Sequence, residues 1–240
     1  MWRRSIALAA LAAFAAFAAL AAMAAVAAVA AGLQPAAVVA AQPQAWNFRV
    51  FLNDSPIGQH RFSLRRDGDE AELRSEARFE VKLLFITAYR YAHTAVERWR
   101  GNCLTGMTAR TDDDGKKLSV DAAATFAAST PTAQEGSRLE VSTGTARQPL
   151  EGCVMSFAYW NPALLKQERL LNAQTGEHEA VRISDAGEER IVVRGVPVTA
   201  RRYRIAGSKN PIDIWYSASR EWLALESTLE GGRRLRYQIE

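Results

Sequence analysis

From Trp46 to the end of the chain, apolar and polar residues alternate in one segment after another, and short turn signals separate the segments. In the first of these segments, Trp46, Phe48 and Val50 alternate with Asn47 and Arg49. A period of two places the apolar side chains on one face of a β-strand. A succession of such segments joined by tight turns predicts an antiparallel sheet.

The alternation predicts about eleven or twelve strands, with Asp67-Gly68 and Asp114-Gly115 as hairpin turns. Asn161 and Pro162 have the residue types of a helix N-cap and first helical position, so we expect a short helical insert near 161–171. We therefore expect a mainly β fold, an antiparallel meander that forms a strongly bent sheet or an open barrel. The segments that we expect to be strands are 46–52, 57–66, 77–83, 89–100, 103–111, 117–126, 179–184, 190–194, 196–206, 212–217, 222–229 and 234–239.

Residues 127–150 interrupt this pattern because they are rich in Ala, Thr, Ser and Gly. Such a composition predicts a mobile loop, and only 138–142 has the alternation of a short strand.

Residues 1–41 have the layout of a secretory signal, with a basic start, an apolar middle and small residues at the cut. Two cations, Arg3 and Arg4, precede 26 residues without a charge. As a helix these 26 residues span about 39 Å, enough to cross a bilayer core of about 30 Å. We therefore expect a separate N-terminal signal helix that is cleaved. An uncleaved inner-membrane anchor, with membrane contact through residues 5–31 alone, is the alternative.

Either outcome predicts a periplasmic protein in which 42–240 is a single β-rich domain. The full chain has 30 Lys and Arg against 26 Asp and Glu, and cleavage removes Arg3 and Arg4, which lowers the net charge from +4 to +2. The remaining arginines occur in isolated pairs rather than in a basic block. We therefore exclude nucleic acid as a partner.

The chain has two cysteines, Cys103 and Cys153. In an oxidising compartment two cysteines commonly pair, which predicts a disulfide, and two buried free thiols are the alternative. The Cys-x-x-Cys spacing of redox-active pairs is absent, and two distant cysteines offer too few ligands for zinc.

No sequence motif for a nucleophile, a phosphate loop or a dinucleotide is present. The three histidines, His60, His93 and His178, lie on different segments without a nearby ligand partner. We therefore assign no catalytic residue, no metal and no cofactor.

Two aromatic-polar clusters are candidates for ligand binding, because Tyr and Trp combine apolar area with one polar group. The candidates are Tyr159, Trp160 and Asn161 in the first cluster and Trp215 and Tyr216 in the second. Ordinary packing in a β-rich core is the alternative explanation.

A series of positions along the chain carries a resemblance to a known family: Trp46, Phe48, Val50, Ile57-Gly58, Trp99, Cys103-Leu104, Thr111-Asp112, Cys153, Phe157 to Asn161, Asn172, Thr175 to Glu177, Gly195, Tyr203, Ile212-Asp213, Trp215-Tyr216, Leu223 and Leu225-Glu226. The chain resembles an uncharacterised family of exported proteobacterial proteins, a domain of unknown function, and this resemblance implies export but no catalytic residue. The β-meander with a helical insert is also similar to the half-barrel of periplasmic lipoprotein carriers, at the level of fold alone.

Three functions follow from these patterns. The first is a binding or carrier domain for an apolar, lipid-like ligand. The second is a structural or assembly protein of the envelope that contacts another envelope protein and holds no small ligand. The third is an enzyme acting on lipid or envelope material, with Asp213, His60 or Tyr159 as acid or base. Convergence of these three groups in one pocket would favour the enzyme, and a cavity inside the sheet would favour the binding protein.

Overall fold

The computed structural model describes residues 43–84, 86–126 and 137–240, which belong to the unit Ala41–Glu240. The described residues form a 13-stranded antiparallel sheet and a second sheet of two short strands. The signal helix expected within residues 1–41 lies outside the described residues.

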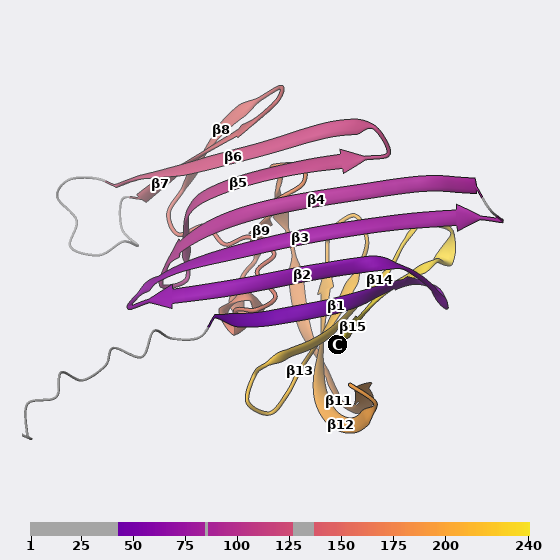
Figure 1. Ribbon diagram of the computed structural model, residues 1–240. Coiled ribbons are helices and arrows are strands. Elements are labelled where there is room, and N and C mark those ends of the chain that lie inside the picture. Colours follow the sequence, from indigo (N-terminus) through magenta and orange to yellow (C-terminus); the bar gives the residue numbers. More distant parts are fainter. Residues whose placement is uncertain (1–42, 85, 127–136) are drawn as a thin grey trace, which may run out of the picture. The chain divides into compact units, whose positions relative to one another are not determined.

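The first part of the large sheet is a meander of eight strands in which each strand pairs with the next. In Figure 1, β1 to β6 lie side by side as one broad layer. The strands are β1 (Gln44–Leu52), β2 (Ser55–Asp67), β3 (Glu70–Leu83), β4 (Ile86–Arg100), β5 (Cys103–Asp113), β6 (Lys116–Phe126), β7 (Ser137–Thr143) and β8 (Arg147–Glu151).

The second part is a meander of five strands, and its last strand pairs with β1. The edge strands β8 and β11 do not pair with each other, so the sheet is open. The predicted mainly β, antiparallel fold is confirmed, and it takes the form of an open sheet. The strands are β11 (Arg182–Val193), β12 (Val196–Ala206), β13 (Ile212–Tyr216), β14 (Trp222–Thr228) and β15 (Arg234–Ile239), with a short 3-10 turn η2 (Glu230–Gly232) between the last two.

Two differences from the predicted strands have a clear origin. β3 begins at Glu70, whereas the sequence predicted a start at 77. The prediction missed the first residues because Ala71 and Leu73, which are buried, alternate with glutamates in a pattern too weak to recognise. Residues 137–151, expected to be mostly loop, form the hairpin β7–β8. β8 contains Pro149, which is tolerated because β8 is an edge strand. The remainder of the expected loop, 127–136, lies outside the described residues.

The segment between β8 and β11, residues 152–181, packs on the face of the sheet that carries the buried core. We call this segment the inner segment and this face the inner face. The backbone N–H of Leu104 on β5 donates to the carbonyl of Val154 at 2.8 Å, and that of Leu171 donates to Met155 at 2.8 Å. This segment and the sheet share one core. Its buried apolar side chains are Val154, Met155, Ala158, Trp160, Leu164, Leu170, Leu171 and Val181, and its buried polar side chains are Ser156 and Asn161.

The helical insert expected near 161–171 is much shorter than predicted. It is a five-residue 3-10 helix, η1 (Pro162–Lys166), with Asn161 at the N-cap. The helix ends at Gln167, whose backbone is extended, and the chain then forms β9 (Arg169–Leu171), which pairs with β10 (His178–Ala180). Strand pairing therefore replaces the second half of the expected helix.

The predicted disulfide between Cys103 and Cys153 is confirmed, with a Cα–Cα distance of 4.9 Å. Cys103 begins β5, whereas Cys153 lies at the start of the inner segment. The covalent bond and the hydrogen bond from Leu104 to Val154 lie next to each other. Together they fix the start of the inner segment to the sheet.

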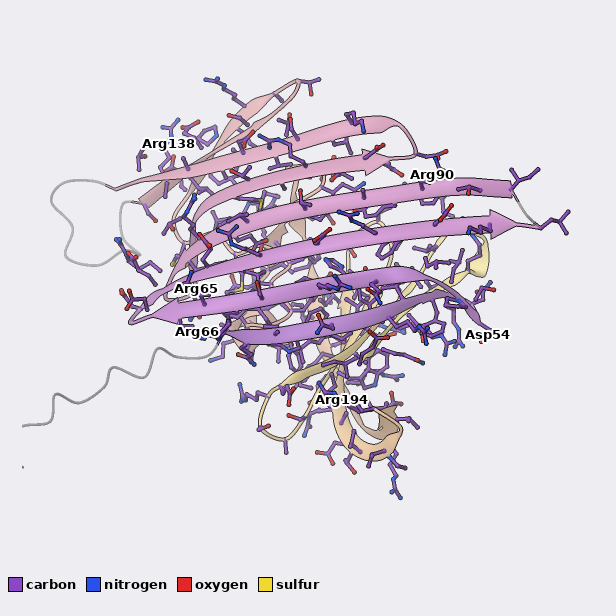
Figure 2. The ribbon with its side chains drawn as sticks, in the orientation of Figure 1. Asp54, Arg65, Arg66, Arg90, Arg138 and Arg194 are labelled. Atoms are coloured by element: carbon purple, nitrogen blue, oxygen red, sulfur yellow. A yellow bond between two sulfur atoms is a disulfide. The ribbon has the colours of Figure 1, made fainter. Side chains whose placement is uncertain are left out.

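The outer surface carries charged side chains spread over many strands. Figure 2 shows Arg90, Arg138 and Arg194 on different parts of the domain. Many of the surface cations pair with carboxylates, as Arg138 does with Glu140 at 2.6 Å. Exposed pairs of this kind contribute little to stability but keep a broad strand surface solvated.

Gly58 is required where β2 bends. It follows an extra residue in β2 at a register shift opposite β1, and its φ is 152°. A Cβ on Gly58 would lie 1.9 Å from the backbone carbonyl oxygen of Arg78 on β3. A side chain there would therefore push β3 away from β2.

We expect Gly58→Ala to lower the free energy of unfolding by about 3 kcal/mol or more, because backbone atoms must move apart. Gly68→Ala is the matched control, since Gly68 also has a positive φ but a Cβ there meets no atom within 4 Å. We expect about 1 kcal/mol for the control. Denaturant titrations of the two variants measure the difference, and equal losses would contradict this role of Gly58.

Reduction of the disulfide should destabilise the domain by about 4 kcal/mol on the chain-entropy model, because the bond closes a loop with a sequence separation of 50. Thermal melts with and without reductant measure the loss. The double variant Cys103→Ser, Cys153→Ser is the control and should melt low in both conditions. A wild-type melting temperature that does not respond to reductant would contradict this prediction.

Candidate functional site

A cavity of about 500 Å³ lies among the inner face of β2–β4, the inner segment and the strands β13–β15. We call it the inner cavity. Thr175 and Lys209 are both exposed and lie on its wall, so the cavity reaches the surface. Its lining residues are His60, Phe62, Leu73, Ser75, Tyr91, His93, Ala95, Glu97, Phe157, Tyr159, Trp160, Asn172 to Thr175, Glu179, Ser208 to Asn210, Ile212, Trp222, Leu225, Ser227, Leu229, Leu235 and Tyr237.

Strand alternation places the sheet's contribution to this wall. On β4, the cavity residues from Tyr91 to Glu97 recur at every second position, as a period of two requires. The register sets Leu73 of β3 opposite Glu97, and Ser75 opposite Ala95. Small residues at Ser75 and Ala95 leave space in the middle of this face.

Aromatic rings from the sheet and from the inner segment meet in the cavity wall. Trp222 lies 5.1 Å from Phe62 and 5.3 Å from Tyr159, measured between ring centroids. Phe157 lies 6.2 Å from Tyr159. These separations are those of favourable aromatic pairs, so the wall is both apolar and well packed.

The first predicted cluster lies partly in this wall. Tyr159 and Trp160 line the inner cavity, and Trp160 also packs edge-on against Trp99 at 5.5 Å. The amide of Asn161 instead caps η1, because its Oδ1 accepts from the backbone N–H of Ala163 at 3.0 Å. Asn161 therefore shapes the segment that carries the two aromatic residues and is not among the lining residues.

The second predicted cluster is divided between two faces of the sheet. Tyr216 is buried in the main core, and its hydroxyl donates to the carbonyl of Tyr159 at 2.6 Å. Trp215 packs in a separate cluster with Ala200 and Leu223, and its indole N–H donates to Glu189. Adjacent residues of a strand point to opposite faces, so these neighbours do not form one site. Whether Tyr159 and Trp160 bind a ligand stays a prediction.

The three groups named for acid–base chemistry do not converge. His60 and Tyr159 line the inner cavity. Asp213 is held on β13 by Arg204, which donates to both carboxylate oxygens at 3.0 and 2.7 Å, and it is not a lining residue. The arrangement therefore lacks the carboxylate of the expected acid–base set.

Glu97 is an ionisable lining residue that sequence reasoning missed. Its side chain is 6% exposed and its carboxylate accepts from Ser156 Oγ at 3.1 Å and from Trp99 Nε1 at 3.2 Å. Burial raises the pKa of Glu97 to about 7, although these two hydrogen bonds oppose the shift. The signal was a carboxylate at an inward position of the alternating β4, between Ala95 and Trp99.

The two histidines on the same wall are neutral for the same physical reason. Burial lowers the pKa of His60 to about 3, with a smaller contribution from His93, and lowers the pKa of His93 to about 4. Nδ1 of His93 lies 2.8 Å from the hydroxyl oxygen of Thr111. Nδ1 of His60 lies 3.3 Å from the Tyr237 hydroxyl, and its buried Nε2 has no partner among the described residues.

A polar turn at 172–175 closes part of the cavity wall. The Tyr91 hydroxyl donates to Oε1 of Gln174 at 2.9 Å, which links β4 to the turn. Asn172 Oδ1 accepts from the backbone N–H groups of Gln174 and Thr175, and Asn172 Nδ2 donates to Glu179 at 2.7 Å. The turn is therefore held in place by hydrogen bonds to its own backbone, to β4 and to β10.

Within residues 43–84, 86–126 and 137–240, no group of three His, Cys, Asp or Glu side chains is arranged to hold a metal ion. Among the same residues, no helix combines the length and the hydrophobicity that a membrane crossing requires.

Comparison with known proteins places the chain in a family. A family model described as "Domain of unknown function (DUF6134)" matches residues 48–240. The chain belongs to this family. The match spans all the strands of the large sheet after the first residues of β1, and the predicted resemblance to a family of unknown function is confirmed.

Among solved structures, the chain is similar to the beta-barrel-like protein of the domain of unknown function DUF1849 from Brucella abortus. The two share 9% sequence identity with a TM-score of 0.58, over 82% of this chain and 95% of that one. At this identity the likeness shows the fold alone. No curated protein matches the sequence.

Glu97→Gln should alter stability in a pH-dependent way. The pKa of Glu97 is raised in the folded state, so its contribution to stability is complete below about pH 4.5 and is lost as the pH rises to about 7. Glutamine carries no such charge and has nearly the same shape. We therefore expect the variant to gain on the order of 2 kcal/mol relative to wild type at pH 8, and much less at pH 5.

Denaturant unfolding of both proteins at the two pH values, with the disulfide intact, measures this difference. Glu72→Gln is the control, because Glu72 lies on the same sheet in ion pairs with Arg74 and Arg98 and does not line the inner cavity. The same change at pH 5 and pH 8 for Glu97→Gln would contradict a raised pKa.

Proposed function

We propose that this protein is a periplasmic binding or carrier protein whose inner cavity holds an apolar, lipid-like ligand. The observation that carries the proposal is the inner cavity itself, with aromatic walls from both the sheet and the inner segment. Its volume of about 500 Å³ falls in the range of small-molecule sites, about 300 to 1,000 Å³. A protein with a purely structural role has no need to leave such a space beside its core.

The chemistry of the wall supports binding rather than catalysis. Apolar and aromatic side chains make up 14 of the 26 lining residues, and polar groups such as Ser75 and Glu97 lie among them. The histidines have pKa values well below neutral pH, so neither is suited to general acid–base work at pH 7. Asp213 lies outside the cavity. A binding site in which polar groups orient a ligand against apolar and aromatic surfaces fits this composition.

Two features support export to an oxidising compartment. The Cys103–Cys153 disulfide is of the kind that persists outside the cytoplasm. The basic and apolar start of the sequence has the layout of a secretory signal. A periplasmic location would give the protein access to lipids of the envelope, the class of ligand that the cavity fits.

Ala173→Trp should abolish ligand binding, because Ala173 lines the cavity in the turn at 172–175 and an indole there would occupy part of the space. We expect a co-purifying lipid-like molecule on the wild-type protein, expressed as the full chain, and an occupancy at least about tenfold lower on the variant. Native mass spectrometry, repeated after organic extraction, measures the occupancy.

Ala88→Trp is the matched control, since Ala88 is exposed on β4 and does not line the cavity. This control should retain wild-type occupancy. A wild-type protein that remains free of ligand after incubation with envelope lipids would sink the proposal.

A further inference from the structure

Glu97 is a buried carboxylate in the wall of the inner cavity, and its hydrogen-bond partners are neutral. Ser156 and Trp99 donate hydrogen bonds to it, and none of the ion pairs formed by the described residues includes it. Neutral donors compensate only part of the cost of burying a carboxylate, whereas an adjacent cation compensates much more. The protein supplies the negative group of a charge pair and leaves the positive one out.

The neighbouring ionisable groups do not provide that cation. His93, four residues away on the same face of β4, is neutral at pH 7 because burial lowers its pKa to about 4. Lys209 borders the cavity but is exposed, on the loop between β12 and β13. Glu179 also borders the cavity and adds a second negative charge rather than a positive one.

The aromatic wall favours the same charge. The face of an aromatic ring is electronegative and attracts a cation, most strongly where water is excluded. Trp160, Tyr159 and Trp222 line the cavity, and the ring centroids of Tyr159 and Trp222 lie 5.3 Å apart. The guanidinium of Arg66, an exposed residue of β2, lies 5.0 Å from the centroid of the Trp160 ring, so this ring already contacts one cation. A carboxylate among aromatic rings is a combination that binds ammonium groups.

We propose that the inner cavity selects ligands in which an apolar chain carries a positively charged ammonium group, bound by Glu97 and by aromatic rings of the cavity wall. This inference rests on the proposed function and adds the charge of the ligand. The ammonium group belongs either to a simple amphiphilic amine or to the headgroup of a zwitterionic lipid, since both present the same cation to the carboxylate.

Four single-chain probes with the same dodecyl tail separate charge from hydrophobicity: dodecyltrimethylammonium, dodecylphosphocholine, dodecyl maltoside and dodecyl sulfate. Binding to the wild-type full chain is measured by titration calorimetry below the micelle concentration of each probe. We expect the ammonium probe to bind at least about tenfold more tightly than the neutral maltoside, and the sulfate to bind most weakly.

Glu97→Gln should reduce this preference to near parity while leaving maltoside binding within about twofold of wild type. Glu72→Gln, which removes a carboxylate that does not line the cavity, should keep the full preference. If dodecylphosphocholine binds as tightly as dodecyltrimethylammonium, the ligand is a lipid with a zwitterionic headgroup. If dodecylphosphocholine binds more weakly, the ligand is a simple amphiphilic amine.

Equal affinities of the wild-type protein for the ammonium and maltoside probes would overturn this inference and leave the proposed function in place. This comparison needs no variant and holds even where Glu97→Gln does not fold. A preference that persists in a folded Glu97→Gln protein would overturn the role of Glu97. Absence of binding by all four probes would count against the proposed function itself.

Discussion

β15 pairs with β1 over the residues opposite Phe48 to Leu52, and this pairing makes one sheet out of two meanders. Every other neighbouring pair of strands in the large sheet is consecutive in the sequence, so its loop is short or moderate. The β1–β15 pair instead joins the beginning and the end of the described chain. Without it, Trp222 on β14 would not face Phe48 and Phe62, and the aromatic side of the cavity would have no partner. The entropy of closing so long a loop makes this the most costly contact to form.

The inner face of a bent sheet cannot be covered by the sheet alone, and the inner segment supplies the missing layer. It is attached to the sheet by the disulfide at Cys153, by the backbone hydrogen bond from Leu104 to Val154, and by the hydroxyl of Ser156, which donates to Glu97. Glu97 therefore has two effects on this part of the structure. It anchors the segment that covers the cavity, and it places an uncompensated carboxylate on the wall that this segment helps to enclose.

The sequence pattern predicts the class of fold well, because a period of two is a local property of each strand. It also predicts the disulfide, since compartment and cysteine count limit the choices. It does not predict the site with the same success. A single-residue step on β13 separates Trp215 from Tyr216 and places them on opposite faces, and a register shift against β14 occurs at that step. The hydrogen bond from Ser156 to Glu97 joins residues 59 apart, and no local pattern contains it.

The buried ionisable groups of the cavity respond to one cause in opposite directions. Burial disfavours charge, so it lowers the pKa of His60 and His93 and raises that of Glu97. The contribution of the two histidines to stability is complete above about pH 6.5 and is lost as the pH falls toward about 3 to 4. The contribution of Glu97 to stability is complete below about pH 4.5 and is lost as the pH rises to about 7.

At neutral pH the domain therefore bears a cost at Glu97 that no residue in the described part of the chain offsets with a positive charge. A bound cation would relieve this cost at the same moment as it gains its own contacts. Ligand binding and folding stability are then linked through one carboxylate. The protein with its ligand would have a higher melting temperature than the empty protein, and the difference would grow with ligand concentration.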